Sequence, residues 1–222
     1  GAVMGDSFGL ENVLWFAKNK EDAHEEPTIK RSRSHDYVSK EVINVRENVG
    51  LIEVANFSKH EFKGPDARKF LDHIMAGRLP KPGRISLSPM LSYRGKLCGD
   101  LTVACLDENE FMVFGSGAVQ EMHRRWFESH LDKFNLSYSN RSDEYHGLSI
   151  AGPNSRKVLE KIVRDDVSNE KFKFRDSRRM FVGGVPAIIN RISFTGELGY
   201  EIYVAPHYQL KLYEELMEAG KE

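Results

Sequence analysis

The chain has 222 residues, of which 40% are hydrophobic, so it can bury the core of one large domain or two small ones, which excludes global disorder. Its 32 lysine and arginine residues nearly balance 33 aspartate and glutamate residues, and the net charge of −1 argues against a nucleic-acid-binding protein. The longest apolar run, at 185–189, is far too short to span a bilayer, and we expect no membrane partner.

The N-terminal part of the chain is predicted to be an arm followed by a linker. Residues 1–17 are rich in apolar and aromatic side chains without a regular period, which indicates an arm that packs on another part of the protein. Residues 18–36 alternate acidic and basic side chains around Pro27, which is typical of a solvated linker. We therefore place the globular domain at 37–222.

The rest of the chain contains an internal duplication. The segment GPDARKFL at 64–71 recurs at 152–159 as GPNSRKVL. Each copy is predicted to follow a short apolar strand, at 51–54 and at 148–151, and to begin a helix, because proline is tolerated in the first helical turn. The apolar residues of each helix fall on one face, which in the two copies consists of Phe70, Leu71, Ile74 and Met75, and of Val158, Leu159, Ile162 and Val163.

A hairpin follows each of these helices. The first joins strands at 97–106 and 111–115, and the second joins strands at 185–194 and 200–205. Further helices are predicted at 119–134 and from Gln209 onward. Hairpins beside separate helices indicate an α+β domain with mostly antiparallel sheets, built from duplicated strand–helix–hairpin units.

The two cysteines, Cys98 and Cys105, lie seven residues apart in one predicted strand. They would be roughly 23 Å apart and would point to opposite faces, so they cannot form a disulfide with each other. No secretory leader is recognisable, and a reducing, cytosol-like compartment is expected.

Three short motifs resemble parts of functional sites, but the residues around them do not support those functions. The segment GDSFG at 5–9 matches a nucleophile elbow, but only four residues precede it and leave no room for the buried strand that an elbow requires. The turn Gly115-Ser116-Gly117 lacks the third glycine of a dinucleotide site, and a tight turn explains it better, although Ser116 could reach a ligand. His123 and His130 share a helical face, but two ligands do not make a metal site, so no metal is expected.

Two acidic residues on predicted strands are candidates for chemistry. Asp100 begins the strand at 99–105, where partial desolvation in a cleft would raise its pKa; a strand-end aspartate held by a turn amide is the alternative. Glu201 and Tyr203 share one strand face, and a carboxylate beside an aromatic ring suits a flat heterocycle with adjacent N–H donors. A solvent-facing Glu201 is the alternative there.

The segment RISFTGELGYEI at 191–202 resembles the signature of the glycine-cleavage T-protein (aminomethyltransferase) superfamily. Within it, four further segments are similar to the folate-binding half of dimethylglycine dehydrogenase and sarcosine dehydrogenase: FGLEN at 8–12, LWFA at 14–17, FGSG at 114–117 and FKF at 172–174. The resemblance extends over essentially the whole chain.

The resemblance implies the aminomethyltransferase folate-binding fold, with tetrahydrofolate as cofactor. In these enzymes an FAD domain oxidises an N-methyl group of a small amine such as dimethylglycine or sarcosine, and the folate half captures the one-carbon unit as 5,10-methylenetetrahydrofolate. The resemblance further implies that Asp100 is catalytic, that Glu201 anchors the pterin, and that Tyr203 and Tyr93 line the pocket. Ser116 stands where the T-proteins carry asparagine. The implied compartment is the cytoplasm, or the mitochondrial matrix in a eukaryote.

The resemblance also implies a longer polypeptide. The family's C-terminal barrel domain is absent from this sequence, as is a flavin domain, so FAD is expected only in a flavin half, on the same chain or as a partner, from which residues 1–36 would lead. The chain alone is expected to be inactive as a dehydrogenase. The alternatives are a stand-alone aminomethyltransferase or folate-dependent demethylase of the same superfamily, and a non-catalytic folate-binding module.

Overall fold

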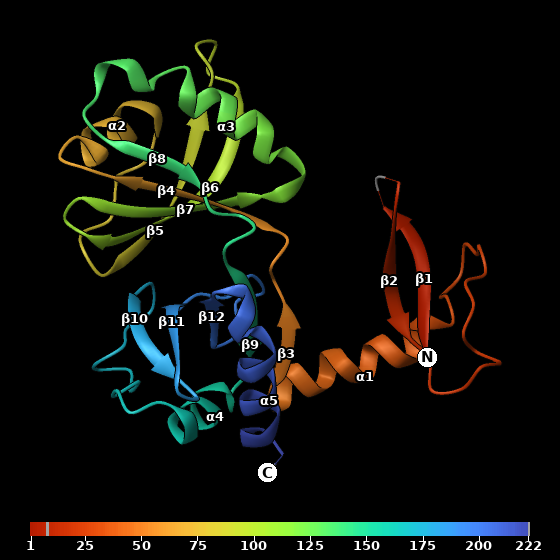
Figure 1. The fold of residues 1–222 in the computed structure, drawn as a ribbon. Coiled ribbons are helices and arrows are strands. Elements are labelled where there is room, and N and C mark those ends of the chain that lie inside the picture. Colours follow the sequence, from red (N-terminus) through yellow and green to blue (C-terminus); the bar gives the residue numbers. More distant parts are fainter. Residues whose placement is uncertain (8, 222) are drawn as a thin grey trace.

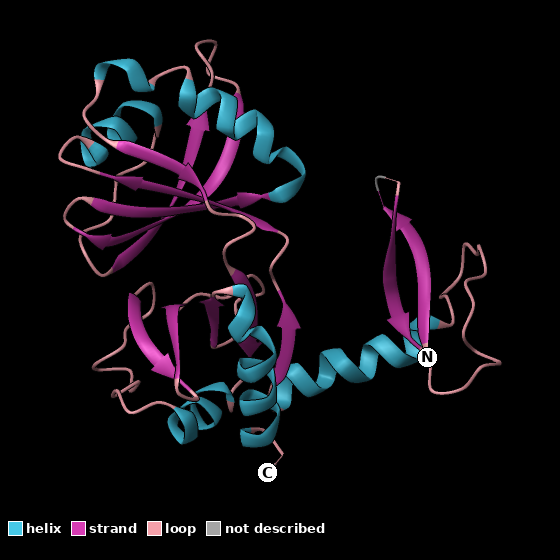
Figure 2. Ribbon diagram, in the orientation of Figure 1, coloured by secondary structure: helices cyan, strands magenta, loops and turns pink. Residues whose placement is uncertain are grey.

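The structure is a computed structural model that describes residues 1–7 and 9–221. Two five-stranded sheets form the body of the molecule, and a hairpin with a long helix extends to one side of them (Figure 1). The helices that follow the strands cover the outer sides of the two sheets (Figure 2). Phe8, which belongs to the elbow-like motif and to the FGLEN segment, lies outside the described residues.

The N-terminal arm is a β-hairpin, β1 (Ala2–Ser7) and β2 (Leu10–Phe16), followed by the helix α1 (Ser34–Glu47). Trp15 is 5% exposed and packs against Tyr37 of α1, with ring centroids 5.1 Å apart. The hairpin was not predicted, because the other apolar residues of β2 stay exposed and produce no alternation. The helix begins inside the segment that was predicted to be a linker.

The first sheet, which we call sheet I, has the strand order β5-β6-β7-β4-β8, with every pair antiparallel. Its strands are β4 (Phe57–Lys63), β5 (Arg84–Leu91), β6 (Leu97–Asp107), β7 (Glu110–Ser116) and β8 (Ser137–Asn140). Helices α2 (Ala67–Ile74) and α3 (Gln120–Glu128) accompany it. The helix predicted at 119–134 therefore ends earlier, and a short 3₁₀ turn, Leu131–Lys133, follows it.

The second sheet, sheet II, has the order β10-β11-β12-β9-β3 and is also antiparallel throughout. Its strands are β9 (His146–Ala151), β10 (Ser177–Val182), β11 (Val185–Asn190), β12 (Gly199–Val204) and β3 (Gly50–Glu53). Helices α4 (Ser155–Ile162) and α5 (Gln209–Ala219) pack on its outer side. The two sheets thus repeat one strand order, which confirms the predicted α+β fold of duplicated units.

The duplicated units exchange one edge strand. β3 precedes the first unit in the chain but pairs with β9 of sheet II, whereas β8 precedes the second unit but pairs with β4 of sheet I. The prediction that 51–54 is the strand before the first Gly-Pro was therefore wrong, because that strand is β4. Polar side chains fill the interior of β4, so it has no apolar pattern: Ser58, Lys59, His60 and Glu61 are all at most 6% exposed.

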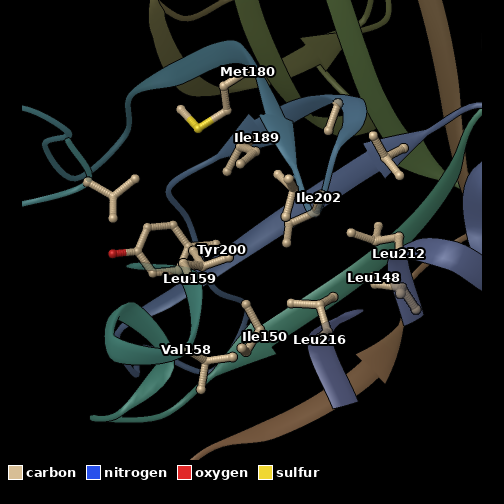
Figure 3. Packing of buried hydrophobic residues seen from close by; sticks show 14 of the residues in the cluster. Leu148, Ile150, Val158, Leu159, Met180, Ile189, Tyr200, Ile202, Leu212 and Leu216 are labelled. Carbon is tan, nitrogen blue, oxygen red and sulfur yellow. The ribbon is translucent and has the colours of Figure 1, made fainter. Parts of the chain in front are cut away.

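Three hydrophobic clusters hold these layers together. One lies between sheet II and its helices and includes Leu159, Tyr200 and Leu212 (Figure 3). A second lies between sheet I and its helices and contains the predicted faces of α2, including Phe70 and Leu71. The third joins the inner faces of the two sheets and consists of Ile85, Ala104, Met112, Phe114, Ile188 and Tyr203. The inner faces are therefore in contact.

Candidate functional site

Alternation along β12 sends its side chains to two different places. Tyr200, Ile202 and Val204 belong to the cluster under α4 and α5, so Glu201 and Tyr203 point from the inner face of sheet II toward sheet I. The ring of Tyr203 is 1% exposed and stacks on Phe114 of β7, with centroids 4.6 Å apart. The predicted shared face is therefore present, on the side that meets the other unit.

The side chain of Glu201 is oriented by Tyr203, its neighbour on the inner face of sheet II. The Tyr203 hydroxyl donates a hydrogen bond of 2.9 Å to Glu201 Oε2. Burial raises the pKa of the Glu201 carboxyl above its ordinary value, and the hydrogen bond from Tyr203 opposes that shift. A ligand that donates N–H groups to this half-buried carboxylate would bind favourably, because each such hydrogen bond stabilises the ionised form.

A row of polar side chains continues from Glu201 across sheet II. Glu201 pairs with Asn190 on β11 and with Ser149 on β9, and Asn190 pairs in turn with Ser177 on β10. Asn190 is fully buried; its Oδ1 accepts a 2.7 Å hydrogen bond from Ser177 Oγ, whereas its Nδ2 has no partner among the described residues. Sequence reasoning missed Asn190, because its proximity to Glu201 follows from strand register, and the sequence pattern does not give the register.

Asp100 and Ser116 lie on the corresponding inner face of sheet I. Thr102 of β6 pairs with Phe114 of β7, so two residues further along each strand Asp100 and Ser116 share the face of Phe114. Both are exposed. The two candidate carboxylates, Asp100 and Glu201, therefore lie on the faces that the two sheets turn toward each other, one on each duplicated unit.

The structure does not bring Tyr93 to this face. Tyr93 lies in the turn between β5 and β6, is 86% exposed, and packs on Trp126 of α3 with centroids 5.3 Å apart. Its hydroxyl lies 3.0 Å from Nε2 of His130. Because α3 covers the outer face of sheet I, Tyr93 lies on the α3 side, whereas the Asp100 side chain points to the inner face.

Two hollows of the surface lie near sheet II and along α1. A shallow cavity of about 360 Å³ borders Tyr203 and Ile188, and its lining includes Tyr145 and Arg179 but neither Asp100 nor Glu201. A wider groove of about 690 Å³ runs along α1, away from both carboxylates. Tyr203 therefore borders this cavity with its ring and contacts Glu201 with its hydroxyl.

The described part of the chain contains no group of three or more histidine, cysteine, aspartate or glutamate side chains placed to hold a metal ion. Within the same part, no helix has the length and hydrophobicity needed to cross a membrane.

Comparison with known proteins supports one family. The family described as "GCVT N-terminal domain" matches residues 1–222. The chain is 35% identical to mouse mitochondrial dimethylglycine dehydrogenase over 99% of its own length and 25% of the enzyme's. It is 31% identical to the alpha subunit of sarcosine oxidase from Rhizobium meliloti, covering 96% of this chain and 22% of the subunit.

A shorter relative is the aminomethyltransferase of Halothermothrix orenii, which is 31% identical over 80% of this chain and 50% of the enzyme. The chain thus spans about a quarter to a half of the curated relatives it matches. Among solved structures, the glycine cleavage aminomethyltransferase T of Bartonella henselae superposes with a TM-score of 0.78 at 21% identity, over 98% of this chain and 54% of that one. This likeness shows a shared fold, and the family match with the curated relatives confirms the resemblance found in the sequence.

Proposed function

The chain belongs to the GCVT N-terminal domain family, and from this premise we propose that it binds tetrahydrofolate and captures a one-carbon unit from a small N-methyl amine of the dimethylglycine or sarcosine type, forming 5,10-methylenetetrahydrofolate. It is an aminomethyltransferase-type domain related to dimethylglycine dehydrogenase. The observation that carries the proposal is the half-buried Glu201 carboxylate, oriented by Tyr203 on the inner face of sheet II.

The polar row suits the edge of a pterin ring. A pterin presents a ring N–H beside an amino group, two parallel donors that one carboxylate can accept, and a carbonyl follows on the other side of the N–H. Glu201 supplies the acceptors. Asn190, its strand neighbour, has a buried amide nitrogen without a partner, and a buried donor left unpaired costs about 1–3 kcal/mol. A ligand carbonyl that reached Asn190 would remove this cost, so the residues present fit the cofactor.

The position of Asp100 supports a role for this carboxylate in moving a proton. It is exposed on the inner face of sheet I, opposite the sheet that carries Glu201. When a folate nitrogen bonds to an electrophilic carbon, that nitrogen loses a proton, and a carboxylate within reach accepts it. Holding the pterin at one sheet and the proton acceptor at the other also replaces a bimolecular encounter by a fixed geometry.

The oxidation of the amine is assigned to a flavin part outside this chain, in cis or as a partner. FAD, when bound there, would take up the two electrons removed from the N-methyl amine, whose methyl carbon thereby becomes the electrophilic one-carbon unit. The residues of this chain bind and orient the acceptor and remove its proton.

Two substitutions in the full-length protein test the proposal. Glu201→Gln replaces one acceptor by a donor while keeping the shape, so tetrahydrofolate affinity measured by calorimetry should fall by about ten- to a hundredfold. Asp100→Asn should leave affinity unchanged and slow the formation of 5,10-methylenetetrahydrofolate from dimethylglycine or sarcosine. Asp132→Asn, an exposed residue of the 3₁₀ turn after α3, is the matched control. Unchanged affinity in Glu201→Gln would overturn the binding assignment.

The relatives named aminomethyltransferase support a second candidate, a transferase that receives an aminomethyl group without a flavin partner. The same assay separates the two, because turnover of an added N-methyl amine requires the flavin part. If Asp100→Asn leaves product formation unchanged while tetrahydrofolate still binds, a non-catalytic folate-binding module explains the chain better.

A further inference from the structure

We propose that His123 is a positioning residue for Asp100: its imidazole is wedged against the ends of β6 and β7, on the face opposite Asp100, and fixes the backbone that carries this carboxylate. This inference rests on the proposed proton-transfer role of Asp100. His123 lies on α3 and is 1% exposed, so it belongs to the covered outer side of sheet I.

Two glycines make room for the imidazole. A Cβ atom on Gly99 would lie 2.8 Å from His123 Nε2, a distance that Cβ atoms in folded proteins essentially never show. A Cβ atom on Gly115 would lie 2.6 Å from the Leu101 side chain and 3.2 Å from both Cε1 and Nδ1 of the same ring. Gly99 immediately precedes Asp100, and Gly115 immediately precedes Ser116. The ring therefore lies against the backbone of both strands directly behind the two inner-face candidates.

The hydrogen bond of His123 is made to an irregular point of β6. The register between β5 and β6 shifts so that Met90 pairs with Gly99 and Leu91 pairs with Leu97, which leaves Cys98 as the extra residue of a bulge. His123 Nε2 lies 3.2 Å from the carbonyl oxygen of Cys98, and because a carbonyl only accepts, Nε2–H is the donor. Bulges re-aim neighbouring side chains, and this bulge lies two residues before Asp100.

The strand end that carries Asp100 has support from one neighbouring strand only. On the β5 side Asp100 pairs with Pro89, whereas on the β7 side the described pairing begins at Thr102. His123 packs on the outer face of this strand end and binds the Cys98 carbonyl, which adds support that the pairing with β7 does not give. Removing the ring therefore frees the segment 98–100 while the rest of β6 remains in the sheet.

The surroundings keep the imidazole neutral. Burial lowers the pKa of His123 and also lowers that of His60, the nearby buried histidine, to about 4. The two rings lie with centroids 6.3 Å apart. A neutral ring with Nε2–H committed to Cys98 acts by shape and by one hydrogen bond, which is the behaviour of a positioning residue.

The test compares four changes in the full-length protein with tetrahydrofolate and dimethylglycine or sarcosine. His123→Leu fills the space but removes the donor, and we expect kcat to fall by about ten- to a hundredfold with tetrahydrofolate affinity unchanged. His123→Gln retains a donor and should recover part of the loss. Gly99→Ala should reduce kcat when His123 is present and have little further effect when combined with His123→Ala, because the steric conflict is then removed.

Phe70→Leu is the matched control, since Phe70 is fully buried on α2 and packs in the same helix-side core, against Phe62 and Phe134. It should lower the melting temperature and leave kcat unchanged. If His123→Leu behaves like Phe70→Leu, or if the Gly99→Ala and His123→Ala effects simply add, His123 is structural and the inference is overturned. If Asp100→Asn itself has no effect on kcat, the proposed function of Asp100 fails instead, and this outcome is distinct from the first.

Discussion

The ring of Phe114, on β7 of sheet I, stacks on the ring of Tyr203, on β12 of sheet II, with centroids 4.6 Å apart and planes inclined by 28°. The hydroxyl of Tyr203 donates a hydrogen bond to the carboxylate of Glu201, so the stacked ring also orients that carboxylate. The orientation of the candidate pterin-binding carboxylate therefore depends on a residue from the other duplicated unit. The pair Phe114–Tyr203 is also the aromatic part of the cluster that joins the inner faces.

Tyr203→Phe should weaken tetrahydrofolate binding without disturbing the stack. The substitution removes only the hydroxyl that holds Glu201 Oε2, and a hydrogen bond of this kind contributes about 0.5–1.5 kcal/mol, so affinity should fall by about three- to tenfold. Tyr138→Phe is the control, because its hydroxyl bonds His60 on the opposite face of sheet I. Equal affinities of the two variants in calorimetry would remove Tyr203 from the site.

Glu201→Gln should change the pH dependence of stability in a defined direction. The carboxyl has a pKa raised above its ordinary value of 4.5 by burial. The folded state therefore holds its proton more tightly than the unfolded state, and this group reduces stability as the pH rises from 4.5 through the raised pKa. Relative to the native protein, Glu201→Gln should gain stability across that window and level off above it.

Chemical denaturation at a series of pH values measures the difference. Glu214→Gln is the control, because Glu214 is an exposed glutamate on α5 and its loss shows how removing a surface carboxylate changes the pH dependence of stability. A difference curve for Glu201→Gln that declines with rising pH would contradict the burial of this carboxylate.

The shared face of Glu201 and Tyr203 was predictable because a strand alternates with a period of two, and β12 keeps its apolar residues on the other face. The helices α2 and α4 were predictable for a similar reason, since Gly-Pro precedes an apolar face at helical spacing. Phe114 and Asn190 were not, because their nearness to Glu201 depends on strand register and on how two sheets meet, which no local pattern specifies.

β4 shows a different limit of sequence analysis. Its interior is polar, and two of its buried side chains bind a distant part of the chain: Glu61 pairs with Arg141 at 3.2 Å, and His60 lies 2.9 Å from the Tyr138 hydroxyl. A buried charge is tolerated only with such partners. Because the partners come from the exchanged strand β8 and its surroundings, the strand becomes recognisable only after the fold is known.

Phe114→Leu should weaken folate binding from a position outside the pterin contact. The change loses the stack on Tyr203 and some apolar area, together about 1–2 kcal/mol of stability, and leaves Tyr203 free to move. Tetrahydrofolate affinity should fall several-fold. Phe111→Leu on the same strand faces the helix-side core, so it should cost similar stability and leave affinity unchanged. Thermal melts and calorimetry on both variants give the comparison, and a loss of affinity in both would indicate a general effect of destabilising β7.

Lys59→Met should flatten the alkaline part of the stability curve. Lys59 is fully buried on β4, paired in register with Phe114, and its Nζ donates to the carbonyl oxygens of Ala55, at 2.5 Å, and Ser142, at 3.5 Å. Ala55 and Ser142 belong to the two connections through which β3 and β8 are exchanged between the sheets. The ammonium group of Lys59 thus binds both of these connections.

Burial lowers the pKa of Lys59 from 10.5 to about 8, although Glu53 and Asp143 favour the charged form. Between about pH 8 and 10.5 the unfolded chain binds more protons at this position than the folded chain, so its contribution makes stability rise with pH across that window, by about 3 kcal/mol in all. Below about pH 8 the full penalty of the buried charge is present. Methionine carries no charge but leaves two carbonyl groups without their donor, which offsets part of the gain at neutral pH.

The native protein should therefore become more stable relative to Lys59→Met as the pH rises from 8 to 10.5. Lys69→Met, with a side chain that is 76% exposed, serves as the control and should show no such trend in urea denaturation. Parallel curves for the native protein and Lys59→Met would show that the buried ammonium is not the group responsible.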